Sequence, residues 1–287
     1  MSVSQHPFEV MLCRLLLSLG LAIGPGVAFS EAPGRVVSMN LCTDQLAMML
    51  AAPGQLHSVT YLAIDPRASA MAEEAEAYQI NRGLAEEIYL MQPDLVIAGA
   101  FSTQATVAML KRLGIPVVVF DPAQSLEDVR DRVMQMGDVL DRQAAARALL
   151  DEFDARLNAL RAEVAERPRA VLYYANGYTS GDQSLAGQIL AVAGFSNVAV
   201  EAGFNAGDTL PMEVLVMTDP DLAITSRPYP GASRAEAILD HPAVTAFRAG
   251  RRSAGMTDRD WVCGTPYVLR AIEALSTVRD DLTGAPQ

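Results

Sequence analysis

Two similar segments, about 125 residues apart, constrain the fold of this 287-residue chain more than any other feature. They are residues 84–98 and 210–224, and each contains an acidic residue, a Pro-Asp pair and then an apolar run. This pattern predicts a short helix that ends at Pro-Asp and leads directly into a buried strand. We interpret the repetition as two lobes of the same design, with a cleft between them.

Strands and helices alternate on both sides of a long helical region. In the first half we expect strands at 35–39, 57–61 and 117–120, and helices at 45–52, 67–80 and 103–113. In the second half we expect strands at 170–174 and 222–225, and helices at 183–193 and 268–282. This alternation is typical of parallel strands that are connected by helices.

One long helix separates the two halves. Apolar residues recur every three or four positions across 142–166, and Pro168 ends the pattern. We therefore predict an α/β fold of two similar lobes, each a parallel-type sheet flanked by helices, joined by one long rigid helix. The predicted parts are an N-terminal lobe at 34–140, a connecting helix at 141–167 and a C-terminal lobe at 168–287.

Residues 1–30 have the pattern of a secretory signal peptide. Arg14 precedes a short apolar run at 15–23, and a Gly-Pro-Gly break and small residues follow. The arrangement predicts cleavage before Glu31, and the apolar run is too short for a comfortable membrane span. The alternative is an N-terminal anchor that is retained. With cleavage, the mature protein is soluble and exported.

Composition limits the classes of partner. About half of the residues are apolar, which is enough for a sizeable core and argues against disorder. The formal charge of −12 disfavours a nucleic-acid partner, because no basic stripe is present to replace the counterions around phosphates.

Export leaves Cys42 and Cys263 in an oxidising compartment. The pair permits one disulfide, which would join the two ends of the chain. The alternative is two separate thiols, because a sequence determines neither their distance nor their orientation.

Taken together, the order of elements resembles a known family: the helical-backbone periplasmic binding proteins of ABC importers, the iron-siderophore and vitamin B12 class. The resemblance covers residues 34–284, nearly the whole mature chain. The segments that carry it are Arg35-Val-Val-Ser before a helix, both Glu-containing segments ending in Pro-Asp-Leu, Leu113-Gly-Ile-Pro-Val117, the long connecting helix, and Asp260-Trp261 before the final helix. Their order and spacing together are more specific than any one of them.

The resemblance implies a periplasmic, monomeric protein that binds a metal chelate or a corrinoid between its lobes and delivers it to an ABC importer permease dimer. In this family an acidic residue on each lobe docks with arginines of the permease, and the repeated segments place Glu86 and Glu213 at those positions. Two exposed carboxylates on matching helices would also attract a basic partner. Glu87 beside Glu86 makes the first choice ambiguous, and both residues have a second interpretation as ordinary solvated carboxylates.

Ligands of open α/β sheets bind beyond the carboxyl ends of the strands. Aromatic side chains bury flat apolar ligand faces, and Arg227 has the chemistry to pair with a carboxylate or phosphate. The candidate ligand-binding residues chosen on this basis are Tyr61, Phe101, Tyr174, Tyr178, Arg227, Tyr229 and Trp261. Tyr173 and Tyr174 alternate in one strand, so one of the two is expected in the core.

The sequence gives little support for metal coordination by the protein or for catalysis. Beyond the leader only His57 and His241 remain, and neither has a second His or Cys at ligand spacing. The motifs of esterases, phosphate-binding loops and zinc proteases are missing from the sequence. We therefore expect no enzyme activity, no protein metal site and no resident cofactor.

The ligand classes that remain open are a ferric siderophore, a cobalamin-like corrinoid and, with less support, heme. The competing function is a chelatase- or nitrogenase-like enzyme that handles a metal or cofactor on a similar two-lobed scaffold. The leader disfavours that function, and a cluster-bearing subunit would need more cysteines. A third interpretation is an exported adaptor that binds only protein.

Overall fold

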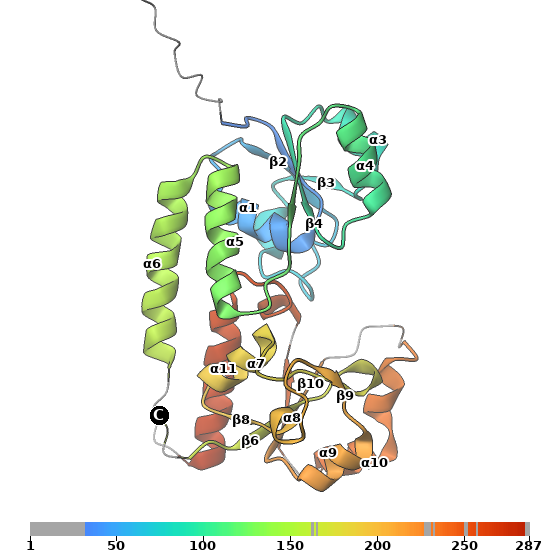
Figure 1. Ribbon diagram of the computed structural model, residues 1–287, viewed down its shortest axis with the longest axis vertical. Helices are drawn as coiled ribbons and strands as arrows, with labels where there is room; N and C mark the ends of the chain where they lie inside the picture. Colours follow the sequence, from blue (N-terminus) through green and yellow to red (C-terminus); the bar gives the residue numbers. More distant parts are fainter. Residues whose placement is uncertain are drawn as a thin grey trace, which may run out of the picture. The chain divides into compact units, whose positions relative to one another are not determined.

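Two separate parallel β-sheets form the framework of the chain in the computed structural model (Figure 1). The structure describes residues 32–161, 164, 166–226, 231, 233–249, 252–256 and 258–284, without the side chains of 246–249, 252–256 and 258. The predicted signal peptide at 1–30 lies outside the described residues. Among the described residues, no helix is both long enough and apolar enough to span a bilayer.

The first sheet has the strand order β3-β2-β1-β4-β5, and all its neighbouring strands are parallel. Its strands are β1 (Val36–Ser38), β2 (Leu56–Thr60), β3 (Gln79–Asn81), β4 (Leu95–Gly99) and β5 (Val117–Phe120). The helices between them are α1 (Leu41–Leu50), α2 (Ala72–Ala75), α3 (Ala85–Leu90) and α4 (Gln104–Arg112). Apolar residues fill β4 on both faces, as expected for a parallel strand that helices cover on each side.

The second sheet has the order β11-β10-β6-β8 and is also parallel. Its strands are β6 (Arg169–Leu172), β8 (Ser196–Asn197), β10 (Leu222–Ser226) and β11 (Arg252–Met256), and a small antiparallel pair is formed by β7 (Tyr178–Thr179) and β9 (Asp208–Thr209). The α-helices of this half are α7 (Leu185–Val192), α8 (Val198–Glu201), α9 (Met212–Thr218), α10 (Pro242–Ala249) and α11 (Val268–Thr283). Short 3-10 turns lie at η1 (Ala175–Gly177), η2 (Glu236–Asp240) and η3 (Asp258–Asp260). The predicted fold class, two α/β lobes with parallel sheets, is confirmed.

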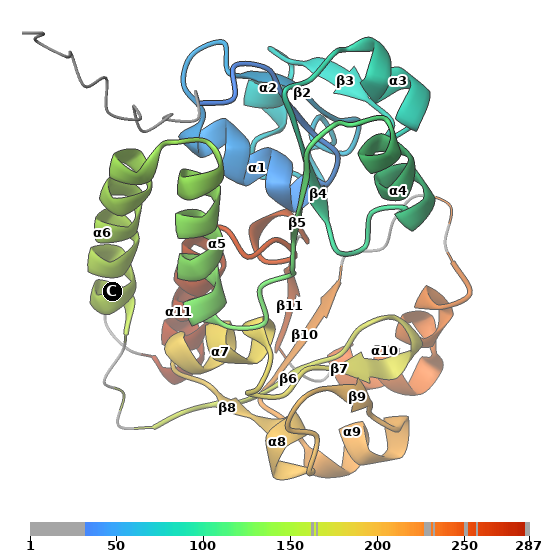
Figure 2. The same ribbon diagram turned by 45° about the horizontal axis from the view of Figure 1, so that its top comes forward.

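Two helices, α5 (Leu126–Val139) and α6 (Gln143–Leu160), lie side by side along one flank of both sheets (Figure 2). The first turns of α5 place Leu126 and Val129 in the core of the second lobe. Its later turns place Val133 and Met136 in the core of the first lobe. The connection between the lobes is therefore a packed pair of helices and not one helix alone.

The boundaries of two predicted helices were wrong. The connecting helix was expected over 141–167, but α6 ends at Leu160, and the backbone of Arg161 is extended. The helix expected over 67–80 is reduced to the single turn α2. The residues after it form the edge strand β3, because Asn81 is buried and its amide donates to Ser38 O at 2.8 Å.

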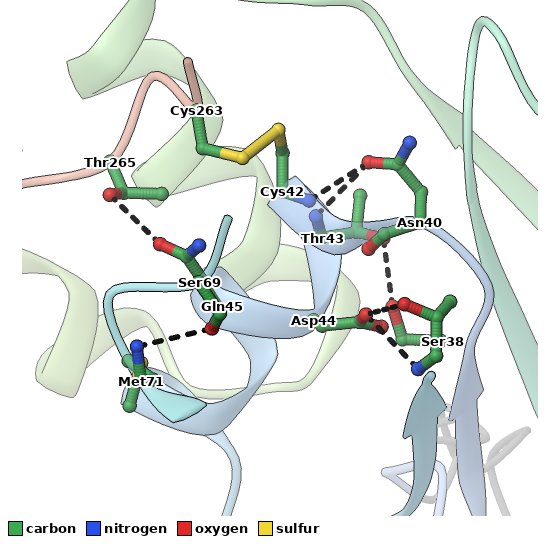
Figure 3. Close-up of a disulfide and its surroundings, with 11 residues drawn as sticks. Ser38, Asn40, Cys42, Thr43, Asp44, Gln45, Ser69, Met71, Cys263 and Thr265 are labelled. Atoms are coloured by element: carbon green, nitrogen blue, oxygen red, sulfur yellow. Dashed lines mark hydrogen bonds between the residues drawn. A yellow bond between two sulfur atoms is a disulfide. The ribbon is translucent and has the colours of Figure 1, made fainter. Parts of the chain in front are cut away.

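A disulfide between Cys42 and Cys263 links the first turn of α1 to the loop before α11 (Figure 3). The two Cα atoms lie 5.0 Å apart, across a sequence separation of 221 residues. Beside it, Thr265 Oγ1 is 3.5 Å from Gln45 Oε1, which adds a polar contact between the same two segments. Of the two alternatives for these cysteines, the structure has the bonded pair.

We predict that the Cys42→Ser/Cys263→Ser protein has a free energy of unfolding lower by about 2–5 kcal/mol, because the bond restricts a very long loop in the unfolded chain. Urea unfolding of the oxidised wild type and the double variant measures this difference. The reduced wild type should match the double variant. Equal midpoints for the oxidised and reduced wild type would contradict the prediction.

Candidate functional site

Each sheet has one topological switch point. At this point the connections that follow two neighbouring strands run toward opposite edges of the sheet. In the first sheet this place lies between β1 and β4, and in the second between β6 and β10. Loops after such strands diverge and leave a crevice at the carboxyl edge of the sheet. One cavity lies at each of these two edges, and the two cavities adjoin each other through Val262.

The first cavity has a volume of about 240 Å³. Its walls come from the loops after β1, β4 and β5, from α5, and from the loop that carries the disulfide. The lining residues include Asn40, Cys42, Phe101, Phe120, Asp121, Arg132 and Val262. Residues from both halves of the chain therefore share one cavity.

Asn40 shapes the wall of this cavity. Its Oδ1 accepts hydrogen bonds from the backbone N–H groups of Cys42 at 3.0 Å and Thr43 at 3.4 Å, so it caps α1. Gly99 at the end of β4 lies directly against it, because a Cβ at position 99 would be 2.7 Å from Asn40 Cγ. The glycine is thus required for the close approach of β4 to the capping residue.

The second cavity has a volume of about 400 Å³ and lies at the carboxyl ends of β6 and β10. Trp261 and Tyr174 line it in an edge-to-face arrangement, with ring centroids 6.1 Å apart and an angle of 82° between the rings. Ser180, Ser226 and Glu236 add polar groups. A wall that combines two aromatic rings with a few polar groups suits a bulky ligand that carries polar substituents.

The structure brings together three of the seven predicted ligand-binding residues. Phe101, which is 84% exposed, lines the first cavity, and Tyr174 and Trp261 line the second. Tyr61 and Tyr178 are about half exposed but line neither cavity. Instead, the Arg82 guanidinium lies 5.7 Å from the centroid of the Tyr61 ring.

The remaining two residues, Arg227 and Tyr229, lie outside the described residues. The two tyrosines directly after β6 point to opposite sides, as expected for an extended chain, since Tyr173 is buried in the core and Tyr174 reaches the cavity.

Sequence reasoning missed Arg132, Phe120 and Asp121. Phe120 is the last residue of β5 and Asp121 follows it, and the candidate set contained no residue from the carboxyl end of this strand. Arg132 lies on α5 between the buried residues Val129 and Val133. Arg132 stands at the margin of the apolar stripe of α5. This position in the sequence is the one signal that its side chain reaches the protein interior.

Asp44 lies behind the first cavity and is fully buried. Its Oδ2 accepts hydrogen bonds from Thr60 N at 3.1 Å and Thr60 Oγ1 at 2.6 Å, while its Oδ1 is buried with no partner among the described residues (Figure 3). Burial raises the pKa of Asp44 to about 7, although the nearby Ser38 hydroxyl and the hydrogen bonds from Thr60 favour the ionised form. The carboxyl group therefore changes its ionisation near neutral pH.

The two repeated segments are alike in three dimensions. Glu86 is the second residue of α3 and Glu213 is the second residue of α9, and both are exposed. Glu87 is half-buried, and its Oε2 accepts a hydrogen bond from Arg82 N at 2.7 Å. Glu86 is thus the carboxylate that corresponds to Glu213.

The same helices expose matching apolar side chains. Leu90, the sixth residue of α3, is 80% exposed, and Met217, the sixth residue of α9, is 83% exposed. The preceding residues, Tyr89 and Val216, are about half exposed. Each lobe therefore presents one acidic and two apolar side chains at equivalent positions.

No group of three or more His, Cys, Asp or Glu side chains suited to a metal ion occurs within the described part of the chain. His57 lies beside Arg35, with Nε2 2.8 Å from Arg35 Nη2. Burial and the charge of Arg35 lower the pKa of this histidine.

Comparison with known proteins identifies the family. The family model described as periplasmic binding protein matches residues 36–254, and the chain belongs to this family. A cobalamin-binding protein of Halobacterium salinarum is 28% identical over 233 residues, which are 77% of this chain and 62% of the relative. A vitamin B12-binding protein of Vibrio parahaemolyticus is 24% identical over 235 residues, 82% of this chain and 78% of the relative.

Solved structures share the fold. A periplasmic heme-binding protein from Pseudomonas aeruginosa superimposes with a TM-score of 0.70 at 20% identity, covering 89% of this chain and 94% of that chain. The resemblance inferred from the sequence is confirmed, and the matched family and the relatives named here are binding proteins and not enzymes.

We predict that ionisation of Asp44 lowers stability. Because the pKa of the folded state is raised above the unfolded value of 3.8, the stabilisation is complete below pH 4 and is lost as the pH rises through about 7. Asp44→Asn keeps the acceptor oxygen but cannot ionise. Urea unfolding at pH 4 to 8 should show the wild type losing stability relative to this variant, and parallel pH profiles would disprove the assignment.

Proposed function

We propose that this protein captures a cobalamin-type corrinoid or another metal chelate in the cleft formed by the two cavities. The observation that supports this most directly is the position of Phe101, Tyr174 and Trp261. These aromatic residues line adjoining cavities at the carboxyl edges of both sheets. Aromatic rings provide a large contact area at a low cost in conformational entropy.

Among the ligand classes, the names of the two curated relatives favour a corrinoid. Heme is the second candidate, because a solved neighbour of the same fold is a heme-binding protein. A ferric siderophore remains the third. In each case the chelator brings its own metal ligands, and we propose that the protein has no resident cofactor.

We further propose that the protein works as a monomer in the periplasm after removal of residues 1–30, and delivers its ligand to the permease dimer of an ABC importer. The matching surfaces of α3 and α9 support the delivery step. Glu86 and Glu213 provide the charge that orients docking. Leu90 and Met217, exposed on the same helices, provide apolar contact area next to each carboxylate.

Ligand binding should change the fluorescence of Trp261, which is the single tryptophan of the chain. Addition of cobalamin to the purified protein is expected to quench this emission in a saturable manner, with heme and a ferric hydroxamate as parallel titrations. The Trp261→Phe protein is the control for signal from other fluorophores. If calorimetry detects no binding of any of the three compounds, the proposed function is wrong.

The proposed docking role of Glu86 and Glu213 predicts a result that is independent of ligand affinity. Glu86→Arg/Glu213→Arg should leave ligand affinity unchanged but reduce uptake at least about tenfold, because each like-charge contact with a permease arginine costs about 2 kcal/mol or more. Uptake is measured in cells whose own gene is replaced by the variant gene. Glu76→Arg/Asp151→Arg makes the same charge change at exposed positions elsewhere and should be neutral. Normal uptake by the first variant would exclude the docking role.

A further inference from the structure

We infer that Arg132 binds an acidic oxygen group, a carboxylate or a phosphate, of the ligand. The inference rests on the proposed function and adds the chemical class of the ligand's polar group. It concerns the first cavity, where Arg132 projects from α5 into a lining that is otherwise mostly apolar or aromatic.

The guanidinium of Arg132 retains hydrogen-bonding capacity. It is half-buried, and its Nη1 donates to Gln135 Oε1 at 2.8 Å, an uncharged partner one helical turn away. Its Nε is buried and donates to no acceptor among the described residues. A buried donor without a partner costs free energy. Arg132 lines the cavity, so a ligand group that pairs with its guanidinium there would offset part of this cost.

Several other arginines of the described structure have acidic partners, unlike Arg132. Arg130, two residues earlier on the same helix, forms ion pairs with Asp154 at 2.6 Å and Glu127 at 3.1 Å. Arg156 and Arg279 likewise form ion pairs, with Glu273 and Asp280. Arg132 forms no ion pair with any described residue, so its charge is not neutralised within that part of the protein.

The other polar groups of the cavity are consistent with this role. Asp121 lines the same cavity, but no ion pair joins it to Arg132 within the described structure. Asn40 directs its amide nitrogen away from α1, because its oxygen is occupied in capping (Figure 3). The amide is thus a second donor in the lining of this cavity, whereas the acidic Glu236 belongs to the second cavity.

Guanidinium and carboxylate or phosphate groups form charge-assisted hydrogen bonds, and these are stronger when the site is shielded from water. The aromatic side chains would then bind the body of the ligand, and Arg132 would select for its acidic substituent. A ligand that lacks this substituent would leave the guanidinium buried without a counter-charge, which is unfavourable.

The test uses ligand pairs that differ in the acidic group. Heme is compared with its dimethyl ester, which lacks free carboxylates, and cobalamin with cobinamide, which lacks the phosphodiester. Affinities are measured by calorimetry on the wild type and on Arg132→Gln. For one pair, the wild type should prefer the acidic member and Arg132→Gln should weaken that member roughly 10- to 100-fold, with little effect on the neutral one. The pair that responds identifies the carboxylate or the phosphate as the group bound.

Arg147→Gln is the matched control, because it removes one positive charge from an exposed position on α6. It should change no affinity, and Arg132→Lys should restore part of the preference for the acidic ligand. If the wild type binds a ligand but Arg132→Gln weakens both members of its pair equally, or neither, the inference is wrong and the proposed function stands. If the wild type binds no member of either pair and no ferric hydroxamate, both are wrong.

Discussion

The packing of α5 against α6 across both lobes is the constraint on which the rest of the structure depends. Leu126 and Val129 at one end of α5 belong to the core of the second lobe, and Val133 and Met136 at the other end belong to the core of the first. Gly137 permits this close packing, since a Cβ there would lie 2.5 Å from Ala146 Cβ on α6. A displacement of one lobe would therefore expose apolar surface in both cores.

The position of the cleft follows from that constraint. Because each sheet has its divergent loops at the carboxyl edge, and because α5, the disulfide and the loop around Val262 join the two halves, the two cavities adjoin. The disulfide links α1 to the same loop that contributes Trp261 and Val262 to the cleft. The covalent tie and the aromatic wall are thus parts of one local structure, and movement of the lobes would have to occur around it.

Much of this architecture was predictable from local sequence patterns. The repeated segments gave the correct order of short helix and strand, and the position of Glu86 relative to Glu213 follows from that repetition. The edge strand β3 was missed because Ile80 and Asn81 are stabilised by pairing with β2 and by hydrogen bonds to Ser38 and Ser58, which are distant in sequence. The end of α6 was not predicted correctly, because apolar residues continue at helical spacing in the sequence after Leu160, where the helix ends.

The candidate site was predicted only in part, and the reason is physical. Aromatic residues after strands, such as Phe101 and Tyr174, are recognisable because strand ends are visible in the sequence. The sequence by itself determined the two-lobed α/β fold and the matched positions of the two acidic residues, since these depend on local periodicity and on repetition along the chain. The family was inferred from its resemblance to known proteins. Only the tertiary structure decided that Cys42 meets Cys263, that Asp44 is buried and that Arg132 enters the cleft without an acidic partner among the described residues. Each of these depends on contacts between segments that the sequence keeps far apart.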